Sequence, residues 1–478
     1  MTAPRVAVVG GGITGLAAAY HLTALSRETQ RPLQVTLFET DPLPGGKIRT
    51  ERIRDLIIEQ GPDSILAHKP WGVDLCRQLN LSSELVHSAE TERSVYVVHR
   101  GRLEPLPPGV MFGAASRPAA LFSTSILSPL GKMRAALEPL VPKRRSREEE
   151  SLAAFLRRRM GSQAARRMAE PLLSAIHAGD SEFLSLDATF PQLRGLEQKY
   201  GSLTRGLRAM NRGRPQKTSM FVTLRRGLDT LVHTTVQNLT GVRMLTSTRV
   251  SAIRPTGDGY QVTTAGGATE TFAAVLIATP AHAAAQMIGS SLPETADHLS
   301  QIPYASTAVV SVAYPARAVP HSMDASGFIV PKSERRTVAG CTWVSSKWPH
   351  AAPAGLRLLR CFADSAGRED LPGLTDQELV AGIHQDLQAL MGIETAPQLA
   401  RVQRWERAMP QYSLGHTGRV NDIEDSLAGY PGLAVAGAAY RGVGVPDCIR
   451  QGREAAGRLA AHLLPLATAS DRGTMTGN

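Results

Sequence analysis

The sequence predicts an α/β protein whose Rossmann-like nucleotide-binding domain is interrupted by insertions. Three observations carry this prediction: a glycine-rich turn after a strand at residues 6–9, a buried strand at 274–278, and a strand, loop and helix at 433–464. These pieces lie far apart in a chain of 478 residues, which is long enough for two or three domains. The other domains are therefore expected between them.

The first piece places the spacing Gly10-x-Gly12-x-x-Gly15 between a strand and a helix of small residues. In a dinucleotide site Gly10 permits the tight turn, Gly12 lets the backbone approach a pyrophosphate, and Gly15 lets the helix and strand pack closely. A second strand, residues 34–38, ends at an acid placed to bind ribose hydroxyls. An ordinary glycine-rich turn is the alternative for the glycines taken alone. The predicted contacts are Gly10, Gly11, Gly12, Ile13, Thr14, Gly15, Glu39 and Thr40.

The segment TDPLPGGKIRT after Glu39 favours FAD over NAD. It resembles the Glu-x-x-x-Arg-x-Gly-Gly-x-x-x-Thr pattern of FAD-dependent amine-oxidase-like and desaturase-like proteins. Glu39, Gly45, Gly46 and Thr50 match this pattern, whereas Leu43 stands where arginine is usual. A second glycine pair permits close backbone approach to a cofactor, and the following Lys47 adds a cation near phosphate.

Composition narrows the class of partner. The net charge is +11 with a pI of about 9.8, and no nucleic-acid motif is present, so an anionic substrate or a membrane surface is favoured over nucleic acid. The four cysteines form no CxxC pair, which predicts neither a metal site nor a disulfide framework and fits a reducing compartment. A folded unit is expected from about residue 5, with no signal peptide and no apolar run of membrane-spanning length. A cytoplasmic protein is therefore expected, either monomer or homodimer, with attachment to the inner face of the membrane as an alternative.

The middle of the chain predicts a helix at 71–79, a hairpin through Gly101, strands between 307 and 362, and a helix at 376–391. Residues 106–145 combine apolar side chains with a following set of cations, which suits either a membrane-facing surface or a helical cap on the body of the protein. Helical spacing follows from 148 to 174, with Arg157–Arg159 expected on a solvated face, and 205–217 is expected as a loop.

These elements predict a discontinuous FAD-binding domain over 1–70, 218–290 and 400–466. An α+β substrate-binding domain is expected over 71–105, 190–217 and 291–399, a helical domain over 106–189, and a polar tail over 467–478. In the last FAD-binding piece a strand stops at Gly437, a glycine-broken loop follows, and Pro446 suits the first turn of a helix. Such a helix N-terminus, aimed at the pyrimidine end of a flavin, would stabilise the negative charge of the reduced ring.

A resemblance to a known family covers nearly the whole chain. It is similar to the oxygen-dependent protoporphyrinogen and coproporphyrinogen oxidases of haem synthesis, which are amine-oxidase-like flavoproteins. The blocks that carry it are VVGGGITGLAAAYHL, PGGKIRT, EQGPDSIL, EPLLSAIHAGD, TFPQL, CTWVSSKWPHAAP, RWERAMPQY and GVGVPDCIRQG. Two of them, CTWVSSKWPHAAP and RWERAMPQY, particularly resemble the Gram-positive type, which acts on coproporphyrinogen III. The resemblance implies FAD, a porphyrinogen substrate, dioxygen as acceptor and hydrogen peroxide as by-product.

The resemblance also implies roles for residues that spacing alone does not single out. Further cofactor contacts would be Gly46, Lys47, Gly61, Pro62, Asp63, Ser64, Val250, Trp405, Gly437, Val443, Gly444 and Val445. The substrate would meet Arg93, as a partner for a propionate, and would lie between Ile329 and Trp343. The alternatives are a solvent-facing arginine and two ordinary core residues.

No certain catalytic residue emerges. Ala175 and His177 stand where relatives usually have glycine and an aromatic residue, in a segment thought to lie near the reacting edge of the substrate. His177 is therefore a candidate acid or base, with a structural histidine as the alternative. Three other functions stay open: a protoporphyrinogen IX oxidase, another amine-oxidase-like or desaturase-like flavoenzyme, and a non-catalytic flavoprotein that binds porphyrin or membranes.

Overall fold

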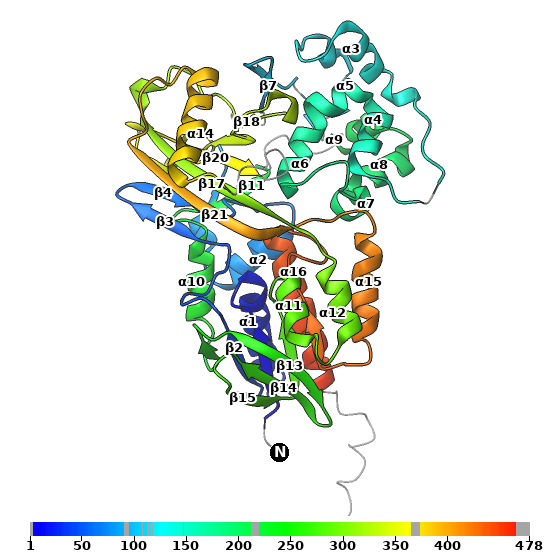
Figure 1. Ribbon diagram of the computed structural model, residues 1–478, viewed down its shortest axis with the longest axis vertical. Helices are drawn as coiled ribbons and strands as arrows, with labels where there is room; N and C mark the ends of the chain where they lie inside the picture. Colours follow the sequence, from blue (N-terminus) through cyan, green and yellow to red (C-terminus); the bar gives the residue numbers. More distant parts are fainter. Residues whose placement is uncertain are drawn as a thin grey trace, which may run out of the picture.

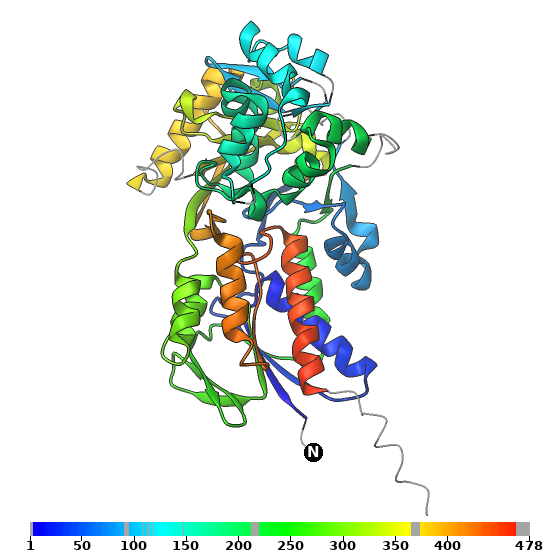
Figure 2. The same ribbon diagram turned by 90° about the vertical axis from the view of Figure 1, so that its right-hand side faces the viewer.

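A computed structural model describes residues 3–89, 95–107, 109–111, 114–116, 118–146, 148–211, 219–364 and 373–464. Arg93 lies outside these residues, as does the predicted polar tail. A nucleotide-binding unit forms one end of the molecule, and a large sheet and a helical unit form the other (Figures 1 and 2).

Five parallel strands form the sheet of the nucleotide-binding unit, in the order β12-β2-β1-β16-β22. These strands are β1 (Arg5–Val9), β2 (Gln34–Phe38), β12 (Arg243–Leu245), β16 (Ala274–Ile277) and β22 (Leu433–Val435). Segments more than 400 residues apart in the sequence thus share one sheet. Because all five strands run the same way, their carboxyl ends meet along one edge, where α/β sheets bind their ligands.

Both faces of this sheet are covered, which explains its almost continuously apolar strands. Val6 and Val8 of β1 face helices α1 (Ile13–Glu28) and α16 (Val445–Leu463), which pack against each other. Ala7 and Val9 face the opposite core, which includes the antiparallel sheet β13-β14-β15. That sheet consists of β13 (Val250–Thr256), β14 (Gly259–Thr264) and β15 (Thr269–Phe272). The same core holds α11 (Ala281–Ile288), α12 (Pro293–Ser300) and α15 (His416–Leu427).

A seven-stranded sheet, in the order β21-β17-β20-β19-β18-β7-β8, forms the second layer. Its strands are β7 (Tyr96–His99), β8 (Arg102–Pro105), β17 (Tyr304–Pro315), β18 (Gly327–Ile329), β19 (Gly340–Trp343), β20 (Leu356–Asp364) and β21 (Leu399–Pro410). Helix α14 (Asp376–Met391) covers one face, and its residues Leu379, Ile383 and Leu387 are fully buried in the shared core. The helix has the predicted bounds because Thr375 and Glu378 form a capping box at its start and Gly392 ends it.

The helical unit packs around its own apolar core. Its main helices are α3 (Pro129–Ala136), α4 (Leu152–Met160), α6 (Glu170–His177), α7 (Leu186–Thr189), α8 (Pro191–Tyr200) and α9 (Leu203–Asn211). A short helix α5 (Ser162–Ala164) and a π-helical turn at Ala165–Ala169 separate α4 from α6, so the predicted helical stretch at 148–174 is interrupted. Within the described residues, no helix combines the length and apolar character that a membrane crossing requires.

Two local predictions are wrong. Arg157–Arg159 was expected on a solvated face, but the Arg159 side chain is 0% exposed and pairs with Glu138, while Arg158 pairs with Glu150 and Glu197. Arg159 is buried and Arg158 is half-buried, because the carboxylates of Glu138, Glu150 and Glu197 converge on them from other segments; Arg157 is half-buried as well. The predicted loop at 205–217 is helical as far as Asn211, where the helix α9 ends, and 212–217 lie outside the described residues.

The packing of several elements also differs from the expected domain boundaries. Strand β21 pairs with β17 in the large sheet, although 400–466 was expected in the nucleotide-binding domain. Helices α8 and α9 pack in the core of the helical unit, and α12 packs on the nucleotide-binding unit. Helix α2 (Pro70–Gln78) also packs on the nucleotide-binding unit, through Leu75 and Cys76. The core on which each of these helices buries its apolar face is set by the fold. The position of the helix in the sequence does not reveal it.

Candidate active site

A glycine cradle lies at the carboxyl edge of the parallel sheet. The Gly10 amide donates to the carbonyl of Phe38 at 2.8 Å, and its φ of +109° is open only to glycine. A Cβ on Gly15 would lie 1.9 Å from the Gly10 carbonyl oxygen, so the helix α1 can approach the strand only with glycine there. A Cβ on Gly12 would meet no described atom within 4 Å. The cradle is thus open at Gly12, as a bound diphosphate requires.

Glu39 closes one side of this cradle. Its carboxylate accepts from the amide of Gly11 at 2.6 Å and from the amide of Asp41 at 2.8 Å. These two bonds orient the acid at the end of β2, while the neighbouring Thr40 is exposed. Oriented in this way, the carboxylate can accept hydrogen bonds from a ribose.

The second glycine pair packs directly on the first. The Gly45 amide donates to the Gly11 carbonyl at 2.8 Å, and a Cβ on Gly46 would lie 3.2 Å from Gly12 Cα. Burial lowers the pKa of the following Lys47. A Cβ on Gly61 would lie 1.7 Å from the Lys47 carbonyl oxygen. The structure therefore brings three predicted segments together. Residues 45–47 contact residues 10–15 on one side and the turn 61–64 on the other.

The C-terminal piece completes the cradle. A Cβ on Gly452 of α16 would lie 2.3 Å from the Thr14 carbonyl oxygen, and a Cβ on Gly437 would lie 3.7 Å from Thr14 Oγ1. Helix α16 begins at Val445 with Gly444 as its N-cap and Pro446 in its first turn. The loop 436–444 and the N-terminus of α16 therefore lie beside the start of α1, and two helix N-termini face the same space.

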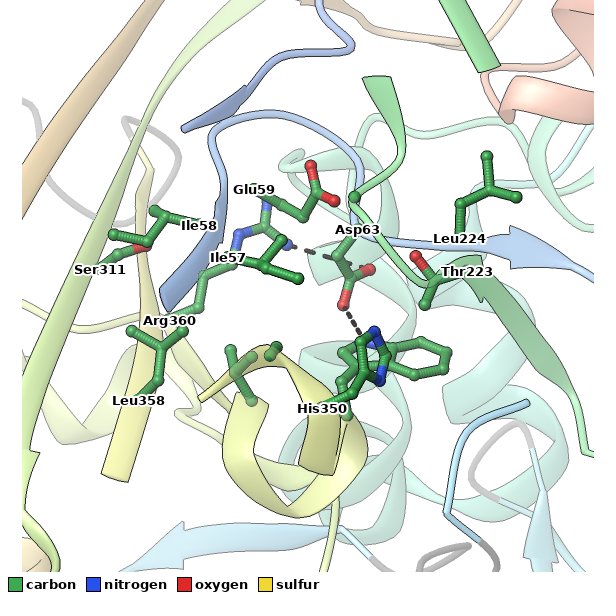
Figure 3. Close-up of a pocket in the computed structure, with 14 residues that line it drawn as sticks. Ile57, Ile58, Glu59, Asp63, Thr223, Leu224, Ser311, His350, Leu358 and Arg360 are labelled. Carbon is green, nitrogen blue, oxygen red and sulfur yellow. Dashed lines mark hydrogen bonds and ion pairs between the residues drawn. The ribbon is translucent and has the colours of Figure 1, made fainter. Parts of the chain in front are cut away.

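A buried cluster of charges joins the 61–64 turn to the large sheet (Figure 3). Lys347 Nζ lies 2.8 Å from Asp63 Oδ2, and the indole of Trp348 donates to the same oxygen at 3.2 Å. Arg360 of β20 donates to the Gly61 carbonyl and lies 4.0 Å from Asp63 Oδ1. Burial raises the pKa of the Asp63 carboxyl, but Lys347 and Arg360 outweigh it and lower that pKa overall.

Glu59, at the end of β4 (Leu56–Glu59), lies beside this cluster and behaves differently. Burial raises its pKa to about 7, against hydrogen bonds from the Leu228 amide at 2.7 Å and the Thr50 hydroxyl at 2.7 Å. The Asp63 and Glu59 side chains line a small cavity of about 20 Å³, enough for about one water molecule. One carboxylate is therefore held ionised and the other titrates near neutral pH.

Three other predicted cofactor residues lie in three different segments. Trp405 of β21 donates its indole hydrogen to the Gln60 carbonyl at 2.8 Å, next to the 61–64 turn. Val250, at the start of β13, is buried in the core under the parallel sheet. Val443 lies in the loop before α16, half-buried.

The predicted catalytic candidates lie in α6 of the helical unit. Ala175 is exposed and His177 is 4% exposed. Burial, with His416 and Lys69 nearby, lowers the pKa of His177 to about 4. Its ring contacts Phe190 and Tyr412 at centroid distances of 5.6 and 5.7 Å, and its Nδ1 has no hydrogen-bond partner among the described residues. A neutral, packed imidazole fits the structural alternative better than an acid at neutral pH.

The predicted substrate residues do not come together. Ile329 of β18 packs into the core of the helical unit, and α6 lies against the same strand. Trp343 of β19 is fully buried in the other core, between the sheet and α14, where it contacts Tyr96 and His321. Trp343 therefore does not line the same space as Ile329, and the core alternative describes it. Arg93 lies outside the described residues.

Sequence reasoning missed several residues that shape this site. Lys347, Trp348, Arg360, Tyr412 and His416 contact the predicted cofactor segments, but none was singled out. Three of them lie in the quoted blocks CTWVSSKWPHAAP and RWERAMPQY, which was the available signal. Their partners are far away in the sequence, so their roles were not visible there.

Comparisons with known proteins agree with this geometry. Residues 13–460 match the family described as flavin containing amine oxidoreductase. The chain belongs to this family. Members of this family contain a flavin, which confirms the cofactor prediction. The flavin is FAD, because the parallel-sheet unit is of the kind that binds dinucleotides. The amine-oxidase-like fold class is confirmed as well.

Three known proteins are similar to this chain in sequence or structure. The chain is 38% identical to a coproporphyrinogen III oxidase of Bacillus subtilis (strain 168), over 94% of this chain and 97% of that protein. It is 30% identical to a coproporphyrinogen III oxidase of Staphylococcus aureus (strain NCTC 8325 / PS 47), over 96% and 99% of the two chains. A solved structure from Exiguobacterium sp. 255-15, named for protoporphyrinogen oxidase, has a TM-score of 0.86 at 32% identity and covers 97% of this chain and 100% of its own.

Proposed function

We propose that this protein is an FAD-dependent oxidase that converts coproporphyrinogen III to coproporphyrin III, with dioxygen as acceptor and hydrogen peroxide as by-product. The observation that carries the proposal is the full-length similarity to coproporphyrinogen III oxidases, together with a cradle whose glycines fit FAD. When bound, FAD accepts electrons from the porphyrinogen and is reoxidised by dioxygen.

The chain's own residues bind and orient in this proposal. Gly12 leaves room for the diphosphate, Glu39 accepts from the adenosine ribose, and the N-termini of α1 and α16 face the anionic cofactor. The Asp63 cluster holds the 61–64 turn against the large sheet. His177, neutral and packed against Phe190 and Tyr412, supports the neighbouring segments. The net charge of +11 suits a substrate that carries four carboxylates.

Protoporphyrinogen IX oxidase is the second candidate, favoured by the name of the Exiguobacterium structure. The two substrates differ by vinyl groups in place of two propionates, so the rim of the site would need fewer cations. Arg93 stays a proposed partner for a propionate.

Porphyrin fluorescence over time, in air, with each porphyrinogen supplied separately, tests the proposal. We expect fast oxidation of coproporphyrinogen III, slower oxidation of protoporphyrinogen IX, and formation of peroxide. Faster oxidation of protoporphyrinogen IX would support the second candidate. Oxidation of neither by the FAD-loaded protein would refute both.

A further inference from the structure

The loop between β22 and α16, residues 436–444, has no regular structure of its own and contains Gly437 and Gly442 at φ of +138° and +120°. It begins at the carboxyl end of a parallel strand and lies against Thr14 of the cradle, so it borders the cofactor space. Buried backbone groups in such a loop need partners from elsewhere in the protein.

Tyr412 supplies two of these partners with one atom. Its hydroxyl donates to the Ala438 carbonyl at 2.7 Å and accepts from the Gly442 amide at 2.8 Å. The side chain is 1% exposed, so water does not compete for either bond. Because Ala438 and Gly442 are four residues apart, the hydroxyl bridges the two ends of this part of the loop and holds them close together.

His416 supplies a third partner from the same side. Its Nε2 lies 3.0 Å from the Tyr440 carbonyl oxygen, which can only accept, so Nε2 carries the hydrogen. The imidazole stacks on the Tyr412 ring with 3.9 Å between centroids and 13° between planes. The two rings therefore hold each other in place while binding alternate residues of the loop.

The segment that carries Tyr412 is itself bound to the helical unit. The backbone carbonyl of Tyr412 accepts from the Ser185 amide at 2.8 Å, and the Leu414 amide donates to the Phe183 carbonyl at 2.9 Å. The side chain of Gln411 donates to the His177 carbonyl at 2.9 Å. Hydrogen bonds thus connect the ends of α6 and α7 to the segment 411–414, and the Tyr412 hydroxyl connects that segment to the loop 436–444.

We propose that Tyr412 and His416 are positioning residues that hold the 438–442 loop in the form the bound flavin requires, with the helical unit as their support. The proposal rests on the proposed function for the identity of the flavin site. It assigns these residues no contact with substrate.

Tyr412→Phe, compared with Tyr314→Phe, tests this proposal on the holoenzyme. Tyr314 is the matched control, because it is equally buried and its hydroxyl also has a hydrogen bond, to His384 at 3.0 Å, but it lies in the core under α14. We expect Tyr412→Phe to speed FAD dissociation about tenfold, since two buried backbone groups lose their partner. We also expect it to shift the visible flavin spectrum and lower kcat more than it raises KM. Tyr314→Phe should change none of these.

Wild-type FAD dissociation and spectrum in Tyr412→Phe would overturn the proposal. If that variant does not fold, His416→Gln and His416→Phe decide instead. Glutamine keeps a donor and should retain FAD, whereas phenylalanine should release it; equal retention by both would overturn the proposal. Because FAD dissociation and the flavin spectrum can be measured without porphyrinogen, a wild type that oxidises no porphyrinogen refutes the proposed function alone.

Discussion

The absence of a side chain at Gly12 decides what the nucleotide-binding turn can hold. The neighbouring glycines are needed by the protein itself, because a Cβ at Gly15 would collide with the Gly10 carbonyl oxygen. Gly12 is different, since a Cβ there would meet no described atom within 4 Å and its φ of −69° suits any residue. A substitution at this residue can therefore block cofactor binding without disturbing the fold.

Gly12→Val is expected to fold but to lose FAD, because the valine side chain would occupy the space of the pyrophosphate. Flavin absorbance per protein after gel filtration measures retention, and the thermal midpoint of the apoprotein measures stability. Gly418→Val, at an exposed position with nothing within 4 Å of its Cβ, is the control and should stay yellow. A fully loaded Gly12→Val protein would refute the role of this residue.

Glu59 links stability to pH. Its pKa is raised from the ordinary 4.5 to about 7, so the folded protein holds a proton that the unfolded chain has released. The free energy of unfolding that it contributes is complete below pH 4.5 and falls as pH rises to about 7, by about 3 kcal/mol in all. Glu59→Gln keeps an acceptor and cannot ionise.

We therefore expect Glu59→Gln to be more stable than the wild type above pH 7, and to lose that advantage toward pH 4.5. Urea unfolding at pH 4.5, 6 and 8 measures the difference. A stability difference that does not change with pH would show that Glu59 is already ionised below pH 6.

At the scale of elements, one turn joins two layers of the molecule. The turn 61–64 follows β4 and is held by Lys347 of α13 (Val344–Lys347) and Arg360 of β20. Both cations are less than 10% exposed, so their charges depend on Asp63. Removing one member of a buried ion pair leaves the other charge without compensation.

Asp63→Asn is expected to lower the free energy of unfolding by about 3–5 kcal/mol. Asp74→Asn is the matched control, because its pair with Arg77 is exposed, with side chains 38% and 64% accessible, and should cost less than about 1 kcal/mol. Urea unfolding of the apoproteins at pH 7 measures both. Equal losses in the two variants would contradict a structural role for the buried cluster.

These elements show what the sequence can and cannot predict. The glycine turn and the helix α14 were predictable because their signals are local: fixed spacing in one, a capping box and a terminal glycine in the other. The burial of Arg159 was not, because its partner Glu138 and the Gly201 carbonyl lie in other segments of the chain. Lys347 and Asp63 are 284 residues apart, so only the fold brings them together.

At the scale of the whole molecule, one segment of the helical unit exposes several large apolar side chains. Five of its large apolar side chains are 49–76% exposed and come from a single segment: Phe122, Leu130, Met133, Leu137 and Leu140. Lys132, Lys143 and Arg145 lie in or just after the same segment, and α3 is at the outer end of the molecule (Figure 1). Apolar groups beside cations are the combination that binds anionic lipid surfaces. The membrane-facing surface expected for residues 106–145 therefore stays a prediction.

Co-sedimentation with vesicles tests this attachment. We expect binding to vesicles rich in phosphatidylglycerol, little binding to phosphatidylcholine, and weakening in high salt, because screening removes the contribution of the cations. Leu130→Glu with Leu140→Glu should lower the affinity at least about tenfold, since two leucines lose their transfer from water. Leu43→Glu, at a residue 71% exposed in the nucleotide-binding unit, is the control and should bind like the wild type. If the wild type stays in the supernatant with anionic vesicles at low salt, the exposed segment does not attach the protein to membranes.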